Sequence, residues 1–156
     1  MSEILYGCKA IKFGVAADTG VMPTPMTKLF DTYRDTVSFV EEDPDVVDEY
    51  SDQSDTPIIS LHTAGAKSLK ASTFDWTPAT LKELKGGTVV DGMWKEPTTS
   101  AIINKAVAVE LDSGHIIRCS KWQVIAKINM EIKKKNIALL EVTMKPLLPV
   151  EIGKPV

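Results

Sequence analysis

The chain has 156 residues, of which 44% are hydrophobic and 25% are charged, and its formal net charge is -3. This length is usual for a single domain, the composition is too apolar for general disorder, and the acidic balance argues against a dedicated nucleic-acid-binding protein. No apolar run approaches the roughly 18 to 20 residues of a membrane span, and the first twenty residues lack the pattern of a secretory leader, so a cytoplasmic protein without membrane contact is expected.

The first half of the chain predicts a series of short strands. Each candidate is bounded by Gly, Pro, Asp or Ser, which favour turns. Residues 20–25 contain two prolines and little periodicity, and they are expected to form a loop. The strand candidates are residues 9–15, 36–42, 58–62, 68–74 and 88–94.

A strongly acidic segment interrupts these strands. Residues 41–55 contain eight Asp or Glu side chains and no Lys or Arg. Such a block repels itself, so residues 41–57 are expected to form a mobile acidic loop in the isolated chain. Val46, Val47 and Tyr50 lie among the charges, and a purely solvated linker would not need them. Two interpretations stay open, a solvated hairpin tip and a segment that becomes ordered against another subunit.

Residues 118–145 offer a basic counterpart to this segment. Only Glu131 and Glu141 oppose a set of Lys and Arg side chains there: Arg118, Lys121, Lys127, Lys133, Lys134, Lys135 and Lys145. Calcium binding is a third, weaker interpretation of the acidic segment. Asp43, Asp45 and Asp48 supply hard oxygen ligands, but their spacing departs from that of an EF-hand loop and no glycine provides its turn.

One short helix is predicted at about residues 77–85. Thr77 suits the N-cap, and Pro78 suits the first helical position, where an N–H would have no intrahelical partner. Leu81 and Leu84 then face the core. Gly86-Gly87 ends the helix.

The C-terminal half predicts a β-meander. Residues 106–111 and 115–119 flank the turn Asp112-Ser113-Gly114, and strict alternation follows from Trp122 to Ile132 with Ile125 as the only exception. After a polar break at residues 133–136 the alternation resumes over 138–145, which predicts an antiparallel hairpin. Seven or eight short strands with one brief helix indicate a mostly-β sandwich or barrel over residues 1–156 as one domain.

The sequence lacks a pattern typical of enzymes. His62 and His115 are the only histidines, and although Ser60, His62 and Asp75 could approach one another, no glycines form a nucleophile elbow. Cys8 and Cys119 are too isolated for a metal site or a disulfide framework and are expected to be buried free thiols. No catalytic residue, cofactor or metal is therefore predicted. Trp76 and Trp94 leave an alternative function open, a β-sandwich module that binds a glycan or a peptide.

Three stretches of the later part of the chain form a recognisable succession. They are Phe74-Asp75-Trp76-Thr77-Pro78 through Gly86-Gly87-Thr88-Val89, the extended runs from Lys105 to Cys119 and through Trp122, and residues 139–149. Together they resemble the tail tube proteins of long-tailed phages, over roughly residues 70–150. The tube protein of bacterial type VI secretion is similar in architecture.

This resemblance implies a fold and an assembly. The fold would be two roughly orthogonal antiparallel sheets in a small barrel, with a flanking helix and an extended C-terminal tail at residues 147–156. The assembly would be a hexameric ring stacked into a tube with a negatively charged lumen, through which DNA or an effector passes without adhering. Implied partners are identical copies and the tape-measure, tail-terminator and baseplate proteins of a phage or prophage, with a virion tail as the final location after the host cytoplasm.

The residues expected at the contacts between copies come from the acidic segment and the triple lysine. They are Glu41, Glu42, Asp43, Asp45, Val46, Val47, Asp48, Glu49, Tyr50, Lys133, Lys134 and Lys135.

Overall fold

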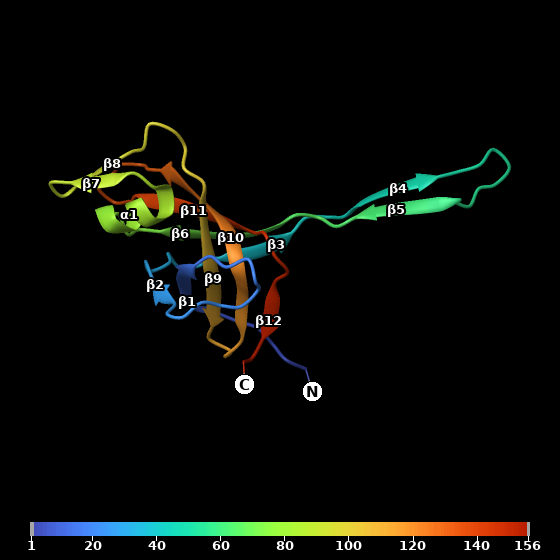
Figure 1. Ribbon diagram of the computed structural model, residues 1–156, viewed down its shortest axis with the longest axis horizontal. Coiled ribbons are helices and arrows are strands. Elements are labelled where there is room, and N and C mark those ends of the chain that lie inside the picture. Colours follow the sequence, from blue (N-terminus) through green and yellow to red (C-terminus); the bar gives the residue numbers. More distant parts are fainter. Residues whose placement is uncertain (1, 156) are drawn as a thin grey trace.

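The computed structural model describes residues 2–155, which form a mostly-β fold with one short helix (Figure 1). The mostly-β class predicted from the sequence is confirmed. In chain order the elements are β1 (Cys8–Val15), β2 (Thr27–Lys28), β3 (Ser38–Glu41), β4 (Asp45–Glu49), β5 (Ile59–Thr63), β6 (Lys67–Thr73), α1 (Pro78–Lys85), β7 (Thr88–Val90), β8 (Met93–Lys95), β9 (Ile103–Leu111), β10 (Ile116–Asn129), β11 (Leu139–Pro146) and β12 (Glu151–Gly153).

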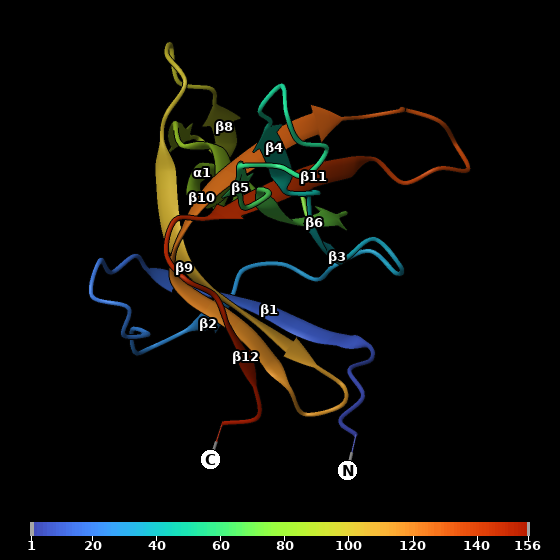
Figure 2. The same cartoon turned by 90° about the vertical axis from the view of Figure 1, so that its right-hand side faces the viewer.

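Eight strands form one antiparallel sheet in the order β2-β1-β9-β10-β11-β6-β3, with β12 paired to β10. The long strand β10 joins two halves of this sheet, because its first part pairs with β9 and β12 and its later part pairs with β11. A register shift between Cys119 and Trp122 lies at the junction. The strands of the two halves run in different directions in Figure 2. The two expected sheets are thus halves of one bent sheet, and within residues 2–155 its ends, β2 and β3, do not close into a barrel.

Several predicted boundaries need correction. Residues 88–94, expected as one strand, form the hairpin β7–β8, whose turn residues Asp91 and Gly92 have positive φ angles of 52° and 75°. Asp-Gly is typical of such two-residue turns. The extended run predicted to begin at residue 115 and the alternation from Trp122 form the single strand β10, which ends at Asn129 and not at Ile132. The C-terminal tail contains β12, which pairs with the start of β10.

The hydrophobic core lies on the inner face of the bent sheet. Trp122, Leu140 and Met144 are completely buried, as the alternation predicted for their strands. Leu81 and Leu84 of α1 join the same cluster, so the helix covers this inner face. Ile125, the exception to the alternation, lies on the opposite face and is 45% exposed.

The helix ends agree with the prediction, but Thr77 does not cap the helix through its side chain. The Thr77 hydroxyl instead donates to Asp75 Oδ1 over 2.6 Å. Gly86, at the C-cap, has a φ of 78°, a left-handed conformation that favours glycine. Both cysteines are free, Cys119 is buried, and partial burial raises the pKa of the Cys8 thiol.

An ion pair between Glu83 and Lys105 links α1 to strand β9 of the sheet. Lys105 Nζ lies 2.7 Å from Glu83 Oε2, and this hydrogen bond together with the lysine charge lowers the pKa of Glu83. A lowered folded-state pKa stabilises the protein above the ordinary glutamate pKa of about 4.3, and the contribution is lost as the pH falls through the folded-state value.

We expect Glu83→Gln to lower the unfolding free energy at pH 7 by less than about 1 kcal/mol, because the carboxylate is half exposed. The difference from the unmodified protein should be smaller at pH 3 than at pH 7, because protonation of the Glu83 carboxyl removes its ion pair with Lys105. Urea unfolding at the two pH values measures this. Glu96→Gln is the control, because Glu96 is exposed and has no ion-pair partner within residues 2–155. An equal loss at both pH values would show that the ion pair is not its cause.

Candidate assembly surface

The acidic segment forms part of a β-hairpin that extends away from the rest of the molecule, on the side opposite α1 (Figure 1). We call residues 43–65 the arm. Where a loop was expected, Asp45–Glu49 is strand β4, paired antiparallel with β5. All ten residues of these two strands are exposed. The arm therefore contributes nothing to the core of its own chain.

The base of the arm continues the pairing of the main sheet. Glu41 pairs with Lys67 across β3 and β6, and the Glu42 N–H donates to the Ala66 carbonyl over 2.8 Å. Gly65 is required next to this pair, because a Cβ there would collide with the Glu42 carbonyl oxygen. The two chain segments thus leave the body side by side.

One face of the arm is both apolar and acidic. Residues directly opposite in an antiparallel pair share a face, as do every second residue along each strand. Asp45, Val47 and Glu49 therefore lie on the same face as Ile59 and Leu61. Val47, Ile59 and Leu61 are each about half exposed, at 51%, 49% and 53%. We call these five residues the acidic arm face.

This exposure needs a physical explanation. An isolated two-stranded hairpin is at best marginally stable in water, and contiguous exposed apolar side chains mark interaction surfaces in soluble proteins. Val46 lies on the other face, at 55% exposed, and Tyr50 follows β4 at 57%. The arm thus combines exposed apolar and acidic side chains on a hairpin whose strands add nothing to the core of their own chain.

The predicted basic counterpart lies at a separate place on the body. Lys133, Lys134 and Lys135 form the exposed turn between β10 and β11, where Lys133 Nζ lies 3.4 Å from Glu131 Oε2. Within residues 2–155, no carboxylate of the arm forms an ion pair with any lysine. Only Glu41, just before the arm, reaches Lys67, at 3.8 Å. One copy of the chain therefore does not bring its acidic and triple-lysine segments together.

Sequence reasoning missed the second strand of the arm as part of this surface. Residues 58–62 were predicted as a strand, but not as the partner of the acidic segment. The signal was present: an apolar run beginning at Ile58 follows the acidic strand after a stretch rich in Asp, Ser and Pro, which is the pattern of a hairpin.

The residues considered for nucleophilic catalysis are not assembled. Ser60 and His62 are exposed on the arm, whereas Asp75 precedes α1 on the body, where it accepts the Thr77 N–H and hydroxyl. His115 is buried, with its Nδ1 2.9 Å from Ser113 Oγ and its Nε2 3.3 Å from Glu3. Its ring nitrogens have local partners, as expected of a core histidine. Across residues 2–155, no three His, Cys, Asp or Glu side chains group as metal ligands.

The tryptophans considered for glycan binding have structural roles. The Trp76 indole N–H donates to the Ala138 carbonyl over 2.9 Å, and that of Trp94 donates to the Gly86 carbonyl over 2.8 Å. Both rings pack against the core.

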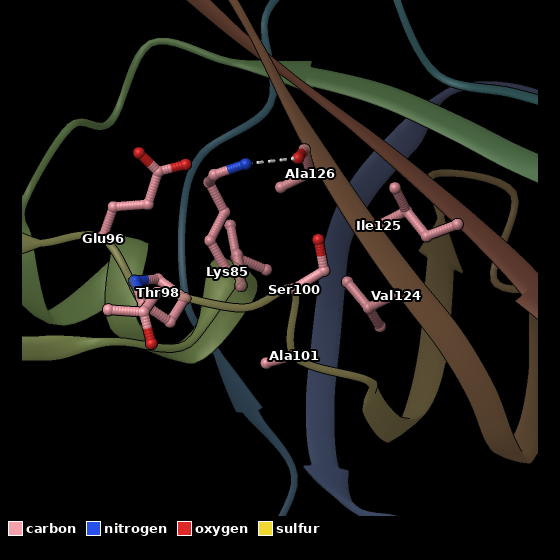
Figure 3. A pocket seen from close by; sticks show the side chains of 10 residues that line it. Lys85, Glu96, Thr98, Ser100, Ala101, Val124, Ile125 and Ala126 are labelled. Atoms are coloured by element: carbon pink, nitrogen blue, oxygen red, sulfur yellow. Dashed lines mark hydrogen bonds between the residues drawn. The ribbon is translucent and has the colours of Figure 1, made fainter.

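A cavity of about 270 Å³ lies between α1, residues 96–101 and β10 (Figure 3). The pairing of β9 with β10 ends at Ile103 and Val124, which leaves the next stretch of β10 without a neighbour on that side. Lys85 Nζ donates to the Ala126 carbonyl over 2.9 Å, the interaction drawn in Figure 3. The lysine therefore satisfies a backbone acceptor of the open edge, which is a structural role.

Comparison with known proteins adds no assignment: neither a family model nor a curated protein matches the chain. At eight residues, α1 is far shorter than a membrane span, and residues 2–155 hold no candidate span.

Proposed function

We propose that this protein is a structural subunit that assembles with identical copies into rings, and that these rings stack into a tube for the passage of DNA or an effector. The observation that carries the proposal is the arm, a projecting hairpin whose apolar and acidic side chains are all exposed in the single chain. An enzyme or a small-ligand receptor would not need such an arm. A subunit that is completed by its neighbours would.

The open edges of the sheet support the same proposal. The outer sides of β2, β3 and β12 have no strand partner within residues 2–155. Unpaired edges promote aggregation in a monomer, but in an assembly they provide backbone donors and acceptors for the next subunit. A contact between different surfaces of identical subunits repeats around a ring until the rotation closes. Six-fold closure is what the resemblance to phage tail tubes implies.

The negative net charge of the chain is compatible with a tube through which DNA passes without binding to its wall. Net charge -3 gives the surface no general attraction for phosphate groups, and phosphate contacts are what make proteins grip DNA. Tape-measure, terminator and baseplate proteins would then contact the ends of such a tube.

Sedimentation over a range of concentrations tests self-assembly. We expect the mass to rise from the 17.1 kDa monomer to a defined multiple and then to much larger particles, and raised salt to shift the transition to higher concentration, because the arm is charged. A monomer that persists unchanged at millimolar concentration would contradict the proposed function.

A further inference from the structure

We propose that the outer face of β10, β11 and β6 receives the acidic arm face of a second copy. This inference rests on the proposed function and adds the surface on which the arm docks. The receiving surface, which we call the lysine face, consists of Lys70, Gln123, Ile125, Lys127, Thr143 and Lys145.

Strand register places these side chains on one face. Ile125 pairs with Thr143, which pairs with Lys70, and these three form one row across the strands. Lys127 lies two residues along β10 on one side of this row. On the other side Gln123 pairs with Lys145. The helix packs on the opposite, inner face, whereas Ile125 is 45% exposed at the centre of the lysine face and its three lysines are exposed.

The lysine face has an unbalanced positive charge. Lys70, Lys127 and Lys145 are exposed, and within residues 2–155 none of the three has a carboxylate within ion-pair distance. The nearby carboxylate of Glu141, opposite Lys127, accepts a hydrogen bond from Asn129 Nδ2 at 2.8 Å. A partner with carboxylates on both sides of an apolar centre would complement this face.

The arm has that arrangement at a matching spacing. On the lysine face, Ile125 lies between the rows of Lys127 and Lys145, which are four residues apart along β10. On the arm, Val47 lies between Asp45 and Glu49, also four residues apart. At about 3.3 Å per residue, Asp45 and Glu49 are about 13 Å apart along β4, and Lys127 and Lys145, on the neighbouring strands β10 and β11, are offset by about 13 Å in the strand direction. Two sheets packed face to face could therefore place Val47 on Ile125 with a lysine near each carboxylate.

The occupant has to be another copy of the chain. The arm points away from its own body (Figure 1), and none of its carboxylates contacts its own lysine face. Every copy carries one acidic arm face and one lysine face, and these are two different surfaces. Such a contact propagates from subunit to subunit instead of ending in a symmetric pair, as a ring or a stacked tube requires.

Charge reversal tests the contact. One double variant reverses the lysine face, Lys127→Glu with Lys145→Glu, and a second reverses the arm, Asp45→Lys with Glu49→Lys. Either double variant should raise the concentration needed for assembly by more than about tenfold, because two attractions between charges become repulsions. The chain with all four changes should regain assembly to within about threefold of the unmodified protein, since its charges are again complementary. Lys82→Glu with Lys95→Glu changes the net charge equally at two exposed positions on α1 and β8, away from the arm and the lysine face, and serves as the control.

The outcomes separate the inference from the proposed function. If the unmodified protein assembles and both reversed chains assemble equally well, or if the four-change chain folds but stays impaired, the docking surface is wrong while the proposed function stands. If the unmodified protein never assembles, the proposed function itself fails. Circular dichroism establishes that each variant is folded.

A disulfide provides a second test that does not depend on charge reversal. The chain with Val47→Cys and Ile125→Cys should form disulfides between copies under oxidation. The control chain carries Val46→Cys and Ile125→Cys, and because Val46 lies on the other face of the arm, it should form far fewer disulfides between copies. Equal linking by both pairs, or by neither, in assembled protein would overturn the proposed contact.

Discussion

Replacing residues 43–65 by Asn-Gly is expected to give a folded monomer that has lost self-assembly by at least about 100-fold in concentration. The Glu42 N–H bonds the Ala66 carbonyl, so these two residues are already positioned to flank a two-residue hairpin turn, for which Asn-Gly is favoured. All residues of the two strands removed are exposed and none belongs to the core, so the core keeps its contacts. Light scattering coupled to size exclusion measures the mass, and thermal unfolding measures the stability.

The matched control shortens only the tip of the arm. Replacing residues 51–57 by a four-residue turn keeps β4, β5 and the acidic arm face, and this variant should assemble within about threefold of the unmodified protein. If the chain without the arm forms the same particles at the same concentration, the arm is not the contact between copies.

Trp122→Ala is expected to lower the unfolding free energy by about 3–5 kcal/mol, the usual cost of removing a large buried aromatic side chain. Trp122 is 0% exposed, its indole N–H donates to the Cys119 carbonyl over 3.0 Å, and its ring meets Phe39 edge-on at a centroid distance of 6.0 Å. It also lies just after the register shift where the sheet bends. Its loss therefore removes a contact between the core and edge strand β3.

Denaturant unfolding measures this effect, with Ile125→Ala as the control on the same strand. Ile125 faces outward, so its truncation should change the unfolding free energy by less than about 0.5 kcal/mol. A loss below about 1 kcal/mol for Trp122→Ala would mean that the core is not organised around this side chain.

The strongest local patterns were enough to predict much of the fold. Alternation from Trp122 onward and over residues 138–145 predicted the β10–β11 hairpin, because a half-buried strand must place every second side chain in the core. Pro78 and Gly86-Gly87 predicted the helix ends, since each has a backbone preference that does not depend on the rest of the chain. The exception at Ile125 was a real feature, an apolar side chain on an otherwise polar face.

Features that depend on distant neighbours were not predictable in the same way. β2 and β12 have two and three residues, and they are strands only because β1 and β10 lie beside them. β4 was missed because its own residues favour solvent, and its pairing comes from β5. That Lys70 from β6 lies in one row with Ile125 from β10 follows from the strand order, which local sequence does not determine.

Electron microscopy of the concentrated, unmodified protein tests the central claim most directly, namely that the arm and the open sheet edges are completed by identical copies. We predict hollow tubes of stacked rings, with density for each arm lying on a neighbouring subunit. A uniform field of single 17.1 kDa particles, at a concentration where phage or secretion tubes would form, would contradict it.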